Sequence, residues 1–189
     1  MSEPEPAWPA DAVFTVGHST RPLAEFIALV KAYGIERIAD IRTVPRSRHN
    51  PQFNADTLGP ALADAGLAYE PLKALGGLRH TTKDSPNLGW RNESFRGFAD
   101  YMQTAGFDAG LAELIAEART APTAIMCAEA VPWRCHRSLV SDALLARHIR
   151  VLEIISKAAP KEHELTSFAR VRGTEVTYPA DQRSLLDPA

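Results

Sequence analysis

Short apolar runs alternate with segments of helical periodicity over most of this chain. The apolar runs predict five strands, over residues 13–17, 35–41, 68–72, 123–126 and 151–155. The segments between them predict helices, over residues 22–33, 55–65, 95–103, 108–120 and 138–148. A helix between two consecutive strands favours a parallel pair with a right-handed crossover. We therefore expect an α/β fold, with a single three-layer domain, a mostly parallel sheet of about five strands and helices on both faces.

The length of 189 residues suits one domain with a shorter segment at each end. Residues 1–10 are rich in proline and poor in apolar side chains, so we expect a flexible N-terminal tail. Residues 11–160 then form the α/β domain. Residues 161–189 form a C-terminal extension that packs on the domain or is partly flexible, with a short helix over residues 163–170 and a strand over residues 175–178.

Composition excludes several classes of protein. A net charge of −2 gives no global basic field that would attract nucleic acid or an anionic membrane. No run of about 18 apolar residues is present, so we expect no membrane partner. Two cysteines do not make a disulfide scaffold, and the acidic, proline-rich start is unlike a signal peptide. Both observations favour a cytoplasmic location. The sequence assigns neither a cofactor nor an oligomeric state.

Polar side chains follow three of the predicted strands. The carboxyl ends of parallel strands meet at one edge of a sheet, where ligands bind in open α/β folds. A single crevice can therefore collect the residues that follow the first, second and fourth predicted strands, which are His18, Ser19, Thr20, Asp40, Arg42, Cys127 and Glu129.

Three of these residues are candidates for proton transfer. Glu129 directly follows a buried strand, where a carboxylate is expected to be paired with an arginine or to do chemistry. Asp40 either holds Arg42 or acts with Glu129 as an acid/base pair. His18 precedes a helix N-terminus, which favours a neutral imidazole that could act as a general acid or base, although a hydrogen-bonded core histidine is an equal alternative.

Several arginines indicate an anion site. Arg42, Arg46, Arg134 and Arg137 can bind phosphate bidentately, and two helix N-termini would add N–H donors. The alternative is a solvated basic loop. Trp133 lies in the same segment and could stack on a nucleobase.

Cys127 and Cys135 are the two cysteines of the chain, and both lie in the segment between the fourth predicted strand and its helix. They could be a nucleophile, a redox pair, metal ligands with His136 and His18, or buried structural residues. Their spacing matches no compact zinc motif, so we predict no metal site.

Several short motifs occur in an order that resembles the bacterial and archaeal proteins called domain of unknown function 488. The resemblance extends from Val13 to Ile155. Its motifs are Gly17-His18-Ser19-Thr20, Asp40-x-Arg42 with Pro45 and Ser47, Leu75-Gly-Gly77, Phe98-x-x-Tyr101-Met102, Cys127-x-Glu129 and Cys135-His136-Arg137. The family name implies no activity, although some relatives carry a DNA-repair label.

Three functions fit these residues. The first is an enzyme or binder acting on a phosphate-bearing ligand, either a nucleotide or a nucleic acid, by hydrolysis or group transfer. The second is a rhodanese-like thiol enzyme that uses Cys127, although ten residues separate Cys127 from Arg137 and a rhodanese loop is shorter. The third is a non-catalytic nucleic-acid- or partner-binding module that uses the basic loop over residues 42–48.

Overall fold

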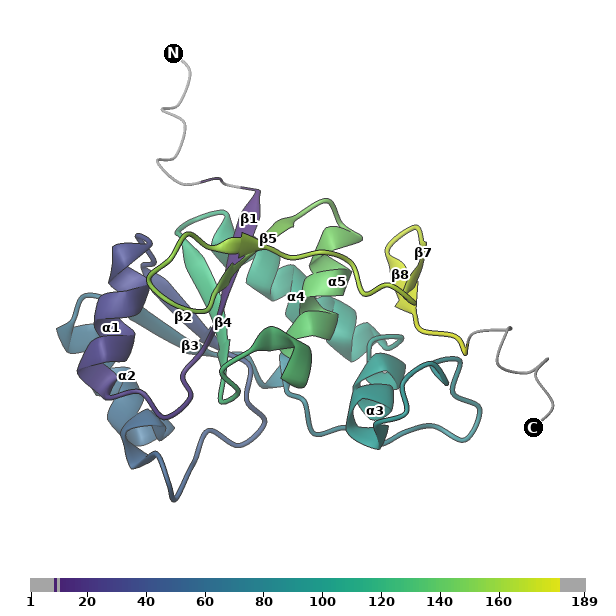
Figure 1. Cartoon of the computed structure of the whole chain (residues 1–189), viewed down its shortest axis with the longest axis horizontal. Coiled ribbons are helices and arrows are strands. Elements are labelled where there is room, and N and C mark those ends of the chain that lie inside the picture. The colour runs from purple at the N-terminus through teal and green to yellow at the C-terminus, as the bar shows by residue number, and fades with distance from the viewer. Residues whose placement is uncertain (1–8, 10, 181–189) are drawn as a thin grey trace, which may run out of the picture.

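The computed structural model describes residues 9 and 11–180 and contains a six-stranded sheet (Figure 1). The strand order is β3-β2-β4-β1-β5-β6. The first five strands run parallel and β6 pairs antiparallel with β5, which confirms the predicted mostly parallel sheet and adds one edge strand. The strands are β1 (Ala12–Gly17), β2 (Arg37–Asp40), β3 (Ala68–Pro71), β4 (Thr123–Cys127), β5 (Arg150–Ile154) and β6 (Lys161–Glu162). The tail predicted over residues 1–10 lies outside the described residues except for Pro9.

Helices cover both faces of the sheet, as Figure 1 shows. One face packs against α1 (Leu23–Ala32) and α2 (Ala55–Asp64). The other packs against α3 (Glu93–Tyr101), α4 (Ala105–Ala118) and α5 (Arg137–Leu145).

The side chains of the central strand β1 alternate between two hydrophobic cores, one on each face of the sheet. Phe14 and Val16 belong to the core under α1 and α2, whereas Val13 belongs to the core on the opposite face. Successive side chains of a strand point to opposite faces, so a continuous apolar run is required where both faces are covered. Burial of every residue of β1 agrees with this requirement.

The C-terminal extension forms a strand within the range predicted over residues 175–178 but differs from its prediction at the helix. No helix forms over residues 163–170. The chain instead continues from β6 as an irregular segment into a hairpin of β7 (Arg170–Arg172) and β8 (Glu175–Thr177). Hydrogen bonds to the domain hold this segment, because the Thr166 N–H and the Tyr178 hydroxyl both donate to the carboxylate of Asp142 on α5. These tertiary contacts outweigh a weak local helical pattern.

A buried histidine anchors the start of the same segment. The His163 ring nitrogens lie 2.8 Å from Glu153 on β5 and 2.9 Å from Asp142. Burial by itself would lower the pKa of His163, but the hydrogen bonds and charges of the two carboxylates outweigh it and raise the pKa to about 9. His163 is therefore an imidazolium at neutral pH and bridges two buried carboxylates.

This arrangement predicts how stability depends on pH. The pKa of His163 is higher in the folded protein than its ordinary value of 6.5, so its stabilising contribution is complete below about pH 6.5 and is lost as pH rises through 9. The difference in free energy of unfolding between wild type and His163→Gln, measured by urea denaturation, should be largest below pH 6.5 and shrink through pH 9. His49→Gln, at an exposed position, is the control. A difference that does not change with pH would contradict the assignment.

Candidate functional site

A cavity of about 450 Å³ opens at the carboxyl ends of β1, β2 and β4. This is the edge at which the sequence placed a crevice. Eight of the predicted site residues line the cavity, namely His18, Arg42, Arg46, Cys127, Glu129, Arg134, Cys135 and His136.

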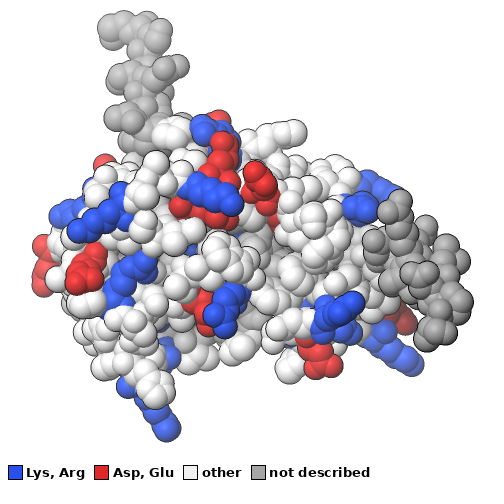
Figure 2. Space-filling model, in the orientation of Figure 1, with Lys and Arg blue, Asp and Glu red and all other residues white. Residues whose placement is uncertain are grey.

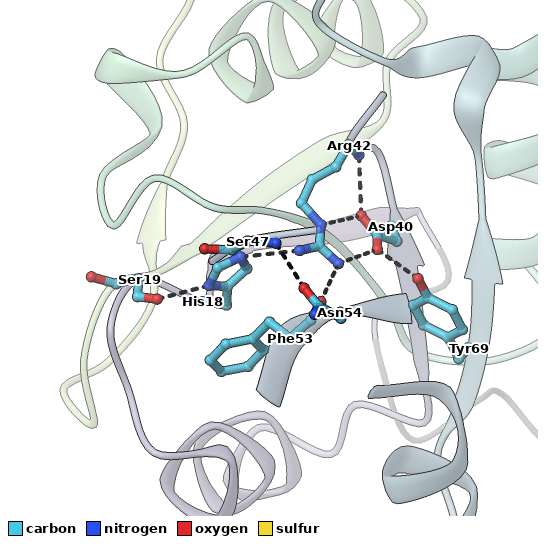
Figure 3. Close-up of polar contacts among 8 residues, drawn as sticks. All are labelled: His18, Ser19, Asp40, Arg42, Ser47, Phe53, Asn54 and Tyr69. Atoms are coloured by element: carbon cyan, nitrogen blue, oxygen red, sulfur yellow. Dashed lines mark hydrogen bonds and ion pairs between the residues drawn. The ribbon is translucent and has the colours of Figure 1, made fainter. Parts of the chain in front are cut away.

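The side chain of Arg42 is held by a buried hydrogen-bond network (Figure 3). Its Nε and Nη2 donate to the two carboxylate oxygens of Asp40 at 2.9 and 2.6 Å, and Nη2 also donates to the Phe53 carbonyl. The Tyr69 hydroxyl donates to Asp40 at 2.7 Å. Asp40 is almost fully buried and does not line the cavity, so the geometry gives it the role of orienting Arg42.

His18 is a neutral imidazole with a fixed tautomer. Burial is the main cause that lowers its pKa to about 4, and the charge of Arg42 adds to the effect. Because the Ser19 carbonyl can only accept, Nδ1 carries the proton and donates to it at 2.8 Å. Nε2 then accepts from Nη1 of Arg42 at 3.3 Å, while the ring stacks on Phe53 (Figure 3).

A second guanidinium, that of Arg137 at the start of α5, lies buried directly behind the cavity wall. Its Nε donates to Cys127 Sγ at 3.0 Å, Nη1 donates to Thr15 Oγ1 at 2.7 Å, and Nη2 donates to the Glu129 carbonyl oxygen at 2.6 Å. Burial lowers the pKa of Arg137 to about 10, so the group stays charged at neutral pH. Among the described residues, no carboxylate oxygen lies within 4.0 Å of this guanidinium, although the charges of Glu153 and Glu129 act on it from farther away.

Cys135 and His136 form the next part of the wall. The His136 Nε2–H donates to the Ile41 carbonyl at 3.1 Å, which leaves Nδ1 unprotonated at 3.5 Å from Cys135 Sγ. Burial lowers the pKa of His136 to about 4, so this imidazole is neutral as well. Glycine is the only residue type that fits at position 77 beside this ring, because a Cβ on Gly77 would lie 2.5 Å from His136 Nδ1.

The mouth of the cavity carries exposed charges. Arg46, Arg134 and Glu129 are all exposed, and within the described residues neither arginine side chain has an acidic partner. Basic and acidic residues are interspersed over the face drawn in Figure 2, so positive charge is not gathered into one broad patch there. The arginines of the candidate site are gathered locally, around the cavity.

Five predicted site residues do not line the cavity. Asp40 and Arg137 lie behind it, and Ser19 contributes its carbonyl to His18. Thr20 is exposed, and Trp133 is 62% exposed beside Arg134.

Other lining residues were not predicted from the sequence. They are Thr43, Val44, Ser47, Gly77, Leu78, Asn92, Ser94, Phe95 and Ala128. Ser47 and Gly77 were available from the motifs of the resemblance. Asn92 and Leu78 come from the long segment between β3 and α3, whose lack of periodicity gives no indication of which side chains face inward.

Among the described residues, no group of three or more His, Cys, Asp or Glu side chains is arranged to hold a metal ion. No helix within the described part of the chain has the length and apolar character needed to cross a membrane.

Comparison with known families supports the resemblance of the motifs. The family model described as domain of unknown function DUF488 matches residues 22–144. The chain belongs to this family. The matched segment contains β2, β4 and most of α5, and with them Arg42, Cys127 and Arg137. No match was found among curated proteins or among solved structures. The DUF488 description carries neither a ligand nor a reaction.

Gly17 provides a test of how tightly the site is packed. A Cβ at this position would overlap the Glu129 carbonyl oxygen and lie 2.9 Å from Arg137 Nη2. Gly17→Ala should therefore reduce the free energy of unfolding by about 1–3 kcal/mol, measured by chemical denaturation. Gly106→Ala on α4 is the control, because a Cβ there would make only ordinary van der Waals contacts, the nearest at 3.4 Å from the Tyr101 hydroxyl, and alanine favours a helix. Equal stability of the two variants would contradict the packing described.

Proposed function

We propose that this protein binds a phosphate-bearing ligand of nucleotide size in the cavity at the carboxyl ends of β1, β2 and β4. The observation that carries the proposal is the pair of exposed arginines, Arg46 and Arg134, which line the cavity without an acidic partner among the described residues. Guanidinium groups match the geometry of phosphate oxygens and bind them bidentately.

The balance of charge around the cavity supports an anionic ligand. Four guanidinium groups lie at or directly behind its wall, those of Arg42, Arg46, Arg134 and Arg137. Asp40 and Glu129 oppose them, and Glu153 also acts on Arg137 but is itself paired with the imidazolium of His163. The two histidines of the cavity wall are neutral. An excess of positive charge beside a partly buried cavity attracts an anion more strongly than the same charges would in water.

The size and the walls of the cavity favour a ligand larger than inorganic phosphate. Its volume of about 450 Å³ falls in the range of sites for small organic molecules. Val44, Leu78 and Phe95 add apolar surface on the same walls. A lining that combines apolar side chains with arginines suits a nucleotide, whose base has flat apolar faces and whose phosphate is charged.

Glu129 is the group best placed for proton transfer if the ligand is a substrate. It is the one carboxylate among the described lining residues. Asp40 is engaged by Arg42 and Tyr69, and the Nε2 lone pair of His18 accepts from Arg42. Hydrolysis or group transfer at the phosphate would then use Glu129 as general acid or base.

Charge removal at the mouth tests the proposal. The double variant Arg46→Ala/Arg134→Ala should weaken binding of inorganic phosphate and of nucleoside monophosphates by about tenfold or more in isothermal titration calorimetry, because two charge-assisted contacts are lost. Arg119→Ala is the matched control, since Arg119 is an exposed arginine at the end of α4, before β4 begins. Binding by the double variant that equals wild-type binding would refute the proposal.

A second candidate function is thiol chemistry at Cys127. The 3.0 Å contact from Arg137 Nε favours the thiolate form of this residue when it is reduced. In sulfur transfer, the Cys127 thiolate would attack the outer sulfur of thiosulfate, and sulfite would leave with the electron pair of the broken S–S bond. Cyanide would then take the persulfide sulfur as thiocyanate and restore the thiolate.

This candidate has a direct assay. Reduced wild-type protein should produce thiocyanate from thiosulfate and cyanide, and Cys127→Ser should abolish the activity while Cys135→Ser retains it. Absence of thiocyanate formation by reduced wild-type protein would exclude this function without affecting the phosphate-binding proposal.

A further inference from the structure

The two cysteines of the chain meet in the wall of the cavity. Cys127 ends β4 and Cys135 precedes α5, and the structure brings their sulfur atoms into contact with the Cα atoms 7.6 Å apart. A small shift of the backbone would bring the pair within the usual range of a disulfide. Both residues belong to the buried core beneath α3, α4 and α5 and also line the cavity, with exposed fractions of 3% and 6%. The pair therefore lies at the boundary between this core and the ligand space.

The surroundings of Cys127 favour an anion at its sulfur. Arg137 donates to a sulfur, a hydroxyl and a carbonyl, and a disulfide between the two cysteines would leave all three acceptors neutral. A buried guanidinium without a contacting anion is costly, and reduction of the disulfide supplies one in the form of the Cys127 thiolate. A thiolate beside a cationic group is the reactive form of cysteine.

The surroundings of Cys135 suit a resolving thiol. His136 is neutral, and its unprotonated Nδ1 lies 3.5 Å from Cys135 Sγ. The orientation of the ring is fixed, because Nε2–H donates to the Ile41 carbonyl. His136 can therefore accept the proton of Cys135 as that sulfur attacks its neighbour.

We propose that Cys127 and Cys135 form a reversible redox site that reacts with a small hydroperoxide and controls the anion affinity of the cavity. The Cys127 thiolate attacks the terminal oxygen of the hydroperoxide, the O–O bond breaks, and protonation of the leaving oxygen yields an alcohol, or water from hydrogen peroxide. Cys127 is thereby oxidised to a sulfenic acid. Cys135 sulfur then attacks Cys127 sulfur, its proton passes to His136 and on to the sulfenic hydroxyl, and that hydroxyl leaves as water. An external dithiol reduces the disulfide and restores both thiols.

The control of affinity follows from charge and rests on the proposed phosphate binding. The reduced site carries a negative charge at Cys127 that neutralises Arg137 and repels an anion in the cavity. The disulfide removes this charge, so the oxidised protein should bind phosphate more tightly. By linkage, bound phosphate should in turn favour the disulfide to the same extent.

The redox site is tested by thiol chemistry on the full chain. Hydrogen peroxide should remove both alkylatable thiols from reduced wild-type protein, with a mass loss of two hydrogen atoms that dithiothreitol reverses. Cys135→Ser should instead accumulate a sulfenic acid at Cys127 that dimedone traps. Cys127→Ser should keep Cys135 alkylatable under the same treatment. Two thiols that remain alkylatable in peroxide-treated wild-type protein would overturn the redox site.

The coupling is tested with inorganic phosphate in calorimetry. Oxidised wild-type protein should bind phosphate at least about fivefold more tightly than reduced wild-type protein, and Cys127→Ser should bind like the oxidised form whether or not reductant is present. Equal affinity of the two wild-type states would overturn the coupling and leave the proposed function intact. No phosphate binding in any state would refute the proposed function and the coupling together, whereas the thiol assay would still decide the redox site.

Discussion

The buried guanidinium of Arg137 is the interaction on which the site depends. Its hydrogen bonds connect three parts of the chain. They reach Thr15 on β1, Cys127 at the end of β4 and the Glu129 carbonyl in the following loop. A charge inside a protein is tolerated only where its hydrogen-bonding groups are satisfied. The loop after β4 must therefore hold one particular path, and that path shapes the wall of the cavity.

Arg42 and Arg137 show two ways of keeping a positive charge near a ligand. Arg42 is paired with Asp40, so its charge is largely neutralised and its main contribution is a fixed position on the wall. Arg137 donates its hydrogen bonds only to neutral groups, so its charge is less completely neutralised, although Glu153 and Glu129 act on it from farther away.

The sequence predicts the strands, the helices and the edge that carries the site better than it predicts the orientation of individual polar side chains. The alternation of strands and helices and the gathering of His18, Arg42 and Cys127 at one edge follow from local patterns and from the rules of parallel sheets. Which polar group faces the ligand depends on tertiary contacts that no local pattern encodes. Asp40 is turned behind the wall by Tyr69, and the segment after His163 is held by carboxylates from α5 and β5.

The central position of β1 has a consequence for the limits of the folding unit. The family match begins at residue 22, after β1 has ended, and stops before β5. A fragment cut to the matched residues would leave β4 as an exposed edge, with a row of unpaired backbone groups where β1 had been. It would also lose Thr15 and with it one of the three acceptors of Arg137. The smallest piece of this chain that can be expected to keep β4 paired on both sides and retain the cavity is therefore longer than the segment by which the family is recognised.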